Sequence, residues 1–409
     1  MPVGDAQSSP GAPRPRLAFV VAALNTGGAE RHAVTLRQHL RARGYEAALL
    51  AIARATSGAL AAEPGAEGAR RLEMRRVLTS PGAWLGAWRA LRRIDADVIF
   101  AVNPACGLIV GVLRRLGLVR GKVVCVFHTS RLQPRERMTF GPFRWIAPRL
   151  DALVYVARAQ QALWAARGLR PARPVVIANG VDLQRFSSAP FDRPAVRAGL
   201  GLAAGDFVVG IVAALRPEKR HQDLIAAAGR LRAKGVPAKL VIVGDGARRS
   251  ELADQAERLG LKDHVLFVGD QVDVRPFVVA SDACALCSEI ETFSLAALEI
   301  LALGAPLVSS DVGAMGEIVK PAVNGLLYPV GNVEALADRL RRLADAPFRE
   351  RLRGAARASV RAFDVQHMVD AYEALATDLS AESAARQSGS GLATIRRSNL
   401  LDQSRSHFE

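Results

Sequence analysis

Short, continuous runs of apolar residues alternate with longer amphipathic stretches along most of the chain. In the first half, six runs have the length of buried strands, at residues 17–24, 46–53, 97–102, 122–128, 151–156 and 174–178. Between the first two, residues 29–43 have helical spacing, and Gly44 ends that helix. Strands that alternate with helices in this way predict a parallel sheet covered by helices.

The same alternation returns in the second half, with buried strands expected at residues 207–215, 239–243 and 282–287. An irregular stretch containing Pro190 and Pro194 separates the halves, so we place a domain boundary near residue 190. The fold class is therefore α/β. Each half is expected to form a Rossmann-like, doubly wound sheet, in which ligands bind at the carboxyl ends of the strands.

Length and composition limit the classes of protein. The 409 residues suffice for two domains, and no apolar run reaches the ~18 residues of a membrane span. Residues 1–15 lack the apolar core of a signal peptide, so we expect a cytoplasmic protein. Cys284 and Cys287 have redox-motif spacing, but they lie in an apolar strand and are expected to be buried thiols.

The formal net charge of +16 predicts an anionic partner. Nucleic acid is disfavoured because the arginines are dispersed, only 5% of residues are aromatic and no binding motif appears. A peripheral hold on an anionic membrane surface is the better functional interpretation. A basic composition without any such role stays open beside it.

The stretch from Cys287 to Asp311 carries the strongest chemical signal. The predicted strand before it leads to Ser294, which can cap a helix that Gly304 and Pro306 end. Free N–H groups at such a helix start bind anions, here those of Thr292, Phe293, Ser294 and Leu295. Glu291 stands above them, and a carboxylate suits a sugar diol because it accepts two hydroxyl hydrogen bonds. Glu299 follows eight positions later, although two glutamates at this spacing mean little alone.

The whole run resembles the nucleotide-sugar signature of the retaining GT-B glycosyltransferases, family 4 in particular. The likeness includes Ser288, Gly304-x-Pro306, Asp311-Val312-Gly313 and Glu317. It extends to Gly27-Gly28-Ala29-Glu30, to the hinge-like residues 179–182 and to a closing turn at residues 324–329, covering roughly residues 17–379.

This resemblance implies a GT-B fold, in which two Rossmann-like domains face a central cleft and the last helix crosses back to the first domain. The expected division is then a disordered start at 1–15, an acceptor-binding domain at 16–190, a nucleotide-sugar-binding domain at 191–362, a crossover helix at 363–380 and a disordered tail at 381–409.

The resemblance also implies roles for single residues. Glu291 and His128 would meet the donor sugar at the reaction centre, and Glu299 would hold the ribose. The diphosphate would lie against Gly27, Gly28, Lys219 and the N–H groups of residues 292–295. The family commonly has an arginine where this chain has Ala214, and Arg216 is our candidate to replace it. Contacts to ribose and base are expected from Gly244, Gly269, Asp273 and Val274.

The predicted function is transfer of a sugar from a nucleotide-sugar donor, a UDP-sugar, to a hydroxyl acceptor with retention of anomeric configuration. The expected setting is bacterial cell-surface polysaccharide, lipopolysaccharide or glycolipid synthesis. No cofactor or metal ion is expected. We reject Asp95-Ala96-Asp97 as a metal motif because it precedes its strand. A basic, aromatic-studded loop at residues 131–149 suits a phosphorylated, lipid-linked or membrane-presented acceptor.

Two alternatives stay open. One is a nucleotide-sugar epimerase of the same fold, which would lack the signature around Glu291 and Glu299. The other is a non-catalytic partner subunit, for which Ala214 is the only support.

Overall fold

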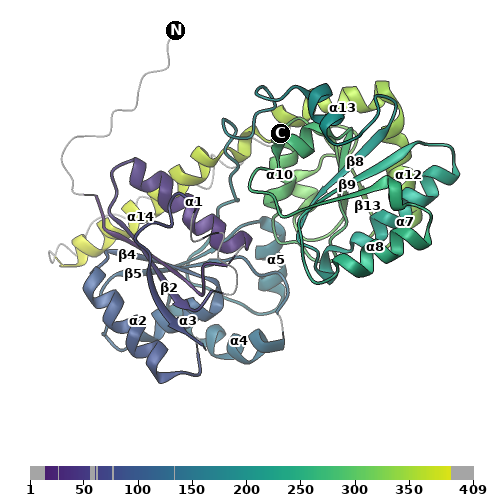
Figure 1. Cartoon of the computed structure of the whole chain (residues 1–409). Coiled ribbons are helices and arrows are strands. Elements are labelled where there is room, and N and C mark those ends of the chain that lie inside the picture. Colours follow the sequence, from purple (N-terminus) through teal and green to yellow (C-terminus); the bar gives the residue numbers. More distant parts are fainter. Residues whose placement is uncertain are drawn as a thin grey trace, which may run out of the picture.

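The computed structural model describes residues 14–25, 27–55, 60, 63–75, 78–132 and 134–387. Two sheets, of seven and six strands, form two domains that lie side by side, each with helices packed on its sheet (Figure 1). The strands in both sheets pair in parallel. The predicted α/β class with two Rossmann-like domains is confirmed.

The first sheet has the order β3-β2-β1-β4-β5-β6-β7. Its strands are β1 (Leu17–Val21), β2 (Ala47–Ala53), β3 (Arg70–Met74), β4 (Val98–Val102), β5 (Lys122–Phe127), β6 (Ala152–Tyr155) and β7 (Pro174–Val176). Its helices are α1 (Gly28–Ala42), α2 (Pro81–Ile94), α3 (Asn103–Arg115), α4 (Pro134–Ile146), η2 (Ala147–Arg149) and α5 (Arg158–Ala166). The central strands are fully buried, which is why they appear in the sequence as unbroken apolar runs.

The second sheet has the order β10-β9-β8-β11-β12-β13. Its strands are β8 (Phe207–Val212), β9 (Ala238–Val243), β10 (Val265–Gly269), β11 (Ala283–Leu286), β12 (Leu307–Ser310) and β13 (Gly325–Tyr328). Its helices are α6 (Arg193–Gly199), η3 (Pro217–Lys219), α7 (His221–Ala233), α8 (Arg249–Arg258), η4 (Lys262–His264), α9 (Arg275–Ala280), α10 (Leu295–Ala302), α11 (Met315–Ile318), α12 (Val333–Ala344), α13 (Ala346–Ser359) and η5 (Arg361–Phe363).

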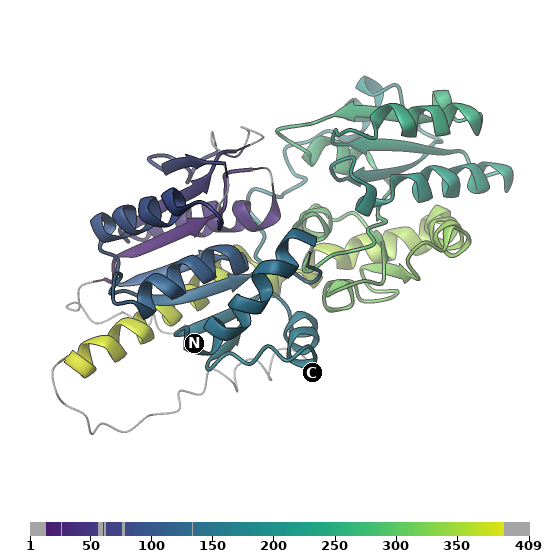
Figure 2. The same cartoon turned by 90° about the horizontal axis from the view of Figure 1, so that it is seen from below.

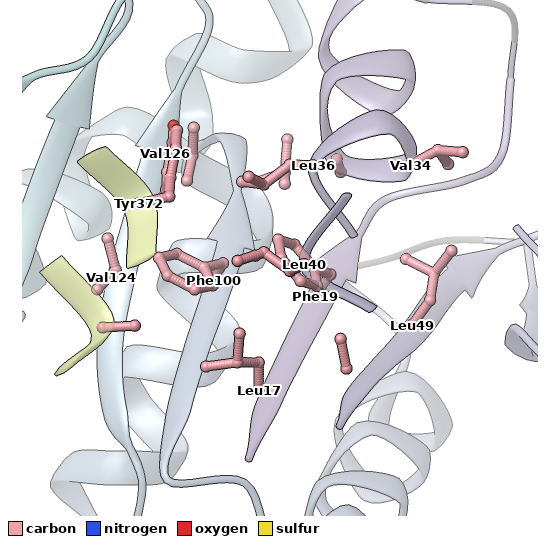
Figure 3. Close-up of a cluster of buried hydrophobic side chains, with 14 of the residues drawn as sticks. Leu17, Phe19, Val34, Leu36, Leu40, Leu49, Phe100, Val124, Val126 and Tyr372 are labelled. Carbon is pink, nitrogen blue, oxygen red and sulfur yellow. The ribbon is translucent and has the colours of Figure 1, made fainter. Parts of the chain in front are cut away.

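The last helix, α14 (Val365–Gln387), returns from the second domain and runs along the first (Figures 1 and 2). Its apolar residues join the core under the first sheet, where Tyr372 meets Phe100 edge to face (Figure 3). At the crossing, the N–H of Val181 donates to the carbonyl of Phe363, and that of Val365 donates back to Val181. The two connections between the domains are thus bonded to each other.

The structure corrects several sequence-based expectations. Helix α14 continues to Gln387, so residues 381–387 are helical and not part of a disordered tail. Residues 131–149, expected as a loop, are mostly α4, because Phe140, Phe143 and Ile146 recur at helical spacing and pack on the first-domain core. Residues 324–329, expected as a turn, contain β13. The disorder expected at residues 1–13 and 388–409 lies outside the described residues.

Two other expectations concern the surface and the thiols. Among the helices that the structure describes, none combines the length and apolar character that crossing a membrane requires. All four cysteines are buried and free, which confirms the expectation for Cys284 and Cys287. Asp95 and Asp97 lie at the amino end of β4, where both pair with Arg16.

Candidate functional site

The loop between β11 and α10 forms the centre of the candidate site. Ser294 is the N-cap of α10, and its hydroxyl accepts a hydrogen bond from the N–H of Ala297. The helix therefore begins where the sequence predicted it, and Gly304 ends it with a φ of +82°. Thr292, Phe293, Ser294 and Leu295 form its first turn and the residues just before it. Their N–H groups lie at the positive end of the helix dipole.

Glu291 and Lys219 meet directly in front of this helix. The Nζ of Lys219 donates to Oε1 of Glu291 at 2.6 Å, and the Ser288 hydroxyl donates to the same oxygen at 2.7 Å. Lys219 comes from η3, at the end of the loop after β8, so carboxyl ends of neighbouring strands supply both groups. A cation, a carboxylate and a helix N-terminus are thus concentrated at one point.

Gly313 fixes the backbone of Glu291 from the loop after β12. It has a φ of +57°, and a Cβ added there would lie 1.8 Å from the Glu291 carbonyl oxygen. Both the conformation and the contact require glycine. The family-like Asp311-Val312-Gly313 segment therefore acts through close packing, and Glu291 can take its place only because residue 313 has no side chain.

Several contacts hold the first domain against this loop. The Thr292 hydroxyl bonds the Ser130 hydroxyl at 3.1 Å, and the Asn179 amide donates to the Phe293 carbonyl at 3.2 Å. Glu317 accepts hydrogen bonds from the N–H groups of Arg158 and Ala159, at the start of α5. The site thus lies at the junction of the two domains.

His128 follows β5, as predicted, and its partly buried side chain packs beside the ring of His32. The backbone N–H of His128 donates to the side-chain oxygen of Asn103 at 3.0 Å, and the His128 ring centroid lies 4.7 Å from that of His32. His32 in turn bonds the Tyr372 hydroxyl at 3.2 Å. The Nε2 of His128 has no hydrogen-bond partner within the described part of the chain. Burial, with His32 beside it, lowers the pKa of His128 well below its usual value, so the ring is neutral at pH 7.

Glu299 lies within α10, half-buried, with Arg31 and Arg185 as its nearest cationic influences. Burial raises the pKa of its carboxyl to about 7, and the two arginines oppose that rise. Arg31 itself pairs with Glu63 at 3.2 Å. The Glu299 carboxyl, whose pKa is near 7, forms no ion pair among the described residues. Its oxygens can therefore accept hydrogen bonds from hydroxyl groups.

The Gly27-Gly28 turn starts α1 and stands beside the same junction. Gly27 is its N-cap, with Glu30 folded back against it. Arg216, at the start of η3, acts on the Glu30 carboxyl across the domain boundary and lowers its pKa, although burial raises that pKa by more. Arg216 thus exerts an electrostatic influence on this turn, and its role as a replacement for the arginine missing at Ala214 stays a prediction.

The residues predicted for ribose and base contacts lie on neighbouring strand ends of the second sheet. Gly244 follows β9 and donates its N–H to the carbonyl of Gly269, at the end of β10, at 2.8 Å. A Cβ on Gly244 would come 2.2 Å from the Ala213 carbonyl oxygen. Asp273 pairs with Arg275 at 2.7 Å, which lowers its pKa. Val274 is the N-cap of α9. These positions share one edge of the sheet, and their binding roles stay predictions.

Sequence reasoning missed several residues that complete the site. Ser288, Ser130 and Asn179 were quoted only as parts of motifs, or not at all, yet each bonds the Glu291 loop. Arg31 and Arg185 influence Glu299 from α1 and from the interdomain segment. Their only sequence signal was a position next to a motif, which does not show where a side chain points. Within the described ranges, no group of three or more His, Cys, Asp or Glu residues is arranged to hold a metal ion.

A hollow of about 590 Å³ opens beside this site, between the domains. Glu291, Ile290 and Gly313 line it from the second domain, and Ser130 and Trp164 line it from the first. The candidate donor groups therefore face a pocket that a second substrate could enter.

Two family models match the chain. One, described as Glycosyltransferase Family 4, matches residues 26–185, and the other, Glycosyl transferases group 1, matches residues 192–359. Each model thus corresponds to one of the two domains.

Curated relatives agree with these models. A D-inositol 3-phosphate glycosyltransferase of Rhodococcus erythropolis is 36% identical over 198 residues, 46% of this chain and 44% of the relative. An N-acetyl-alpha-D-glucosaminyl L-malate synthase of Bacillus anthracis is 31% identical over 181 residues, 44% of this chain and 47% of the relative. The putative glycosyltransferase EpsD of Bacillus subtilis is 26% identical over 277 residues, which cover 64% of this chain and 72% of EpsD. The chain spans about half the length of the first two relatives.

Solved structures share the arrangement of both domains. HepE from Anabaena, in a complex with UDP, superposes with a TM-score of 0.77 at 23% identity, covering 89% of this chain and 100% of that chain. Sucrose-phosphate synthase from Thermosynechococcus elongatus gives 0.75 at 21% identity, covering 90% and 100%. At identities below 25%, these superpositions establish the GT-B fold and nothing finer. The models establish the family: this chain belongs to glycosyltransferase family 4.

Proposed function

We propose that this chain is a glycosyltransferase that moves a sugar from a UDP-sugar to an acceptor hydroxyl, with retention of anomeric configuration and without a metal ion. The observation that carries the proposal is the Lys219–Glu291 pair at the N-terminus of α10. One side of this pair can neutralise a diphosphate, and the other can accept hydrogen bonds from sugar hydroxyls.

In the proposed reaction, the acceptor hydroxyl oxygen bonds to the anomeric carbon as the bond from that carbon to the diphosphate breaks. The hydroxyl proton passes to the departing diphosphate oxygen, and UDP leaves. Negative charge grows on the diphosphate, where Lys219, Arg216 and the N–H groups of residues 292–295 stabilise it. Gly27 and Gly28 let that group approach the backbone closely. Glu291 and the neutral His128 hold the donor sugar, and no residue serves as a covalent nucleophile. Attack from the face that the diphosphate leaves would retain the anomeric configuration.

Ribose and base belong to the second domain in this proposal. Glu299 accepts hydrogen bonds from the ribose hydroxyls, and the strand-end loops at Gly244, Gly269, Asp273 and Val274 take the base. The names of similar proteins support a UDP donor, since HepE from Anabaena is described in complexes with UDP and with UDP-glucose. The names of two relatives include anionic molecules, D-inositol 3-phosphate and L-malate, which supports an anionic acceptor.

We place the activity in bacterial cell-surface polysaccharide, lipopolysaccharide or glycolipid synthesis, in the cytoplasm and peripherally on the inner face of the membrane. The net charge of +16 supports an anionic surface as partner. Helix α4 supports it as well, because Met138 and Trp145 are 83% and 56% exposed there among arginines.

A nucleotide-release assay with a panel of UDP- and GDP-sugars tests the proposal. The wild-type protein should release UDP, with or without a metal chelator, and the Glu291→Gln variant should release it far more slowly. Glu257→Gln is the matched control, because Glu257 on α8 pairs with Lys262 and does not line the pocket. Formation of an epimeric sugar would instead identify an epimerase. Absence of both release and donor binding would identify a non-catalytic subunit.

A further inference from the structure

The pocket beside Glu291 has a basic rim supplied by the first domain. Arg131 precedes α4, Arg137 lies on α4, and Arg167 caps the C-terminus of α5. All three side chains line the pocket together with Glu289 and Glu291. Because three cations line one pocket, the number of them that carboxylates neutralise determines the charge of the ligand that can bind there.

The two carboxylates are already neutralised by other partners. Glu291 receives Lys219 at 2.6 Å, and Glu289 receives Arg131 at 2.8 Å. No salt bridge to Arg137 or Arg167 occurs among the described residues. These two guanidinium groups therefore leave the pocket with about two unbalanced positive charges, which match the charge of a phosphate monoester near pH 7.

Arg167 is held ready for such a ligand. Its guanidinium lies over the Trp164 ring, 5.0 Å from the centroid, and its Nη1 donates to the Ser130 carbonyl at 3.4 Å. Trp164 is itself buried and donates to the Thr129 carbonyl at 2.7 Å. Stacking restricts the arginine, so less rotamer entropy is lost when it binds an anion.

Apolar residues make up much of the remaining pocket lining. Leu132, Phe140 and Trp164 of the first domain are among them. A ligand would therefore contact hydrophobic surface along one face and place its anionic group on the rim. Glu291, where the sugar is transferred in the proposed reaction, lines the same pocket.

We infer that this pocket is the acceptor site and that it takes a phosphorylated acceptor, whose phosphate monoester binds Arg137 and Arg167 while a hydroxyl group points toward Glu291. This inference rests on the proposed function and adds to it the chemical class of the acceptor. A soluble sugar phosphate and a lipid phosphate headgroup share this chemistry.

The test is a calorimetric titration of the full-length protein saturated with UDP, so that Lys219 is already engaged. Inorganic phosphate and glucose 6-phosphate should bind, and glucose, which is neutral, should bind far more weakly. The double variant Arg137→Ala/Arg167→Ala should lose at least about tenfold in phosphate affinity, because each contact is a hydrogen bond to a charged group. Arg137→Gln/Arg167→Gln serves if the alanine variant melts early.

Arg115→Ala is the matched control, because Arg115 is exposed near the end of α3 in the same domain and does not line the pocket. It should bind phosphate as the wild type does. Undiminished phosphate affinity in the double variant, or an equal loss in Arg115→Ala, would overturn the inference. Vesicles of phosphatidylcholine with and without phosphatidic acid then distinguish the source, since only a lipid phosphate site would bind the acidic vesicles through Arg137 and Arg167.

UDP titrations of the same variants keep the two proposals separate. Wild-type UDP affinity combined with lost phosphate binding supports both. If the wild type does not bind UDP, the proposed function fails, and phosphate titrated without UDP still tests the arginine pair.

Discussion

Replacing Glu291 with glutamine should strengthen the binding of UDP and slow turnover. The substitution keeps the size of the side chain and removes its charge. Because Glu291 already holds the Lys219 ammonium at 2.6 Å, an arriving diphosphate must compete with this carboxylate for the same cation. Glutamine competes less, so UDP should bind more tightly to Glu291→Gln than to the wild type.

The exposure of the pair sets the magnitude. The Lys219 and Glu291 side chains are 25% and 12% exposed, so their interaction should exceed that of a surface ion pair, which contributes about 0.2–1 kcal/mol. A gain of about 1 kcal/mol corresponds to about fivefold tighter UDP binding. Turnover should fall about 10- to 100-fold, because a hydrogen bond to a charged group contributes about 1.5–3 kcal/mol and this one would strengthen in the transition state.

Calorimetry with UDP and nucleotide release at saturating donor measure the two quantities. Glu257→Gln, which removes an exposed carboxylate that pairs with Lys262 on the surface at α8 and does not line the pocket, should leave both nearly unchanged. If Glu291→Gln binds UDP more weakly and melts earlier, the pair is structural. If it turns over normally at saturating donor, Glu291 does not hold the sugar.

The remaining predictions concern the donor site, a buried carboxyl, a glycine and the surface. Lys219→Ala should weaken UDP binding tenfold or more, since the lost phosphate contact contributes about 1.5–3 kcal/mol, and Arg216→Ala should also weaken it; wild-type affinity would remove either residue from the site. The raised pKa of Glu299, about 7 against 4.5, means that stability is lost as pH rises through about 7. Glu299→Gln should therefore melt like the wild type near pH 4 and be more stable at pH 8, by up to about 3 kcal/mol, while raising the donor KM; a pH-independent difference in melting would contradict this. Gly313→Ala should destabilise the protein by about 2 kcal/mol or more and slow donor turnover, because its Cβ would overlap the Glu291 carbonyl, whereas Gly316→Ala, where a Cβ meets nothing within 4 Å, should fold and turn over normally. Binding to anionic vesicles should fall as salt rises, and a protein that ignores such vesicles at low salt would leave the basic charge without this role.

The sequence predicted most strands that lie inside each sheet, because a strand buried on both faces must be apolar throughout. It did not predict β12, which is also inside its sheet and fully buried. It also missed two strands at the sheet edges. Edge strand β3 is Arg70–Met74, mostly polar and only partly covered, and β13 occupies a segment read as a turn. The loop expected at residues 131–149 is helix α4, whose proline and glycine obscured an apolar stripe that only packing on α3 explains.

The sequence by itself also determined the start of α10, since Ser294 caps the helix through a contact three residues apart, and it predicted an anion site there. Tertiary structure alone decided which charges gather at that point. Lys219 and Glu291 are separated by 72 residues, and Glu317 reaches the start of α5 across 158. Local propensity acts over a few residues, whereas the sheet order sets which strand ends adjoin. Only the folded chain therefore places Glu291 against Lys219 and His128 beside His32. It also leaves Arg137 and Arg167 at the pocket without a salt bridge to any described residue.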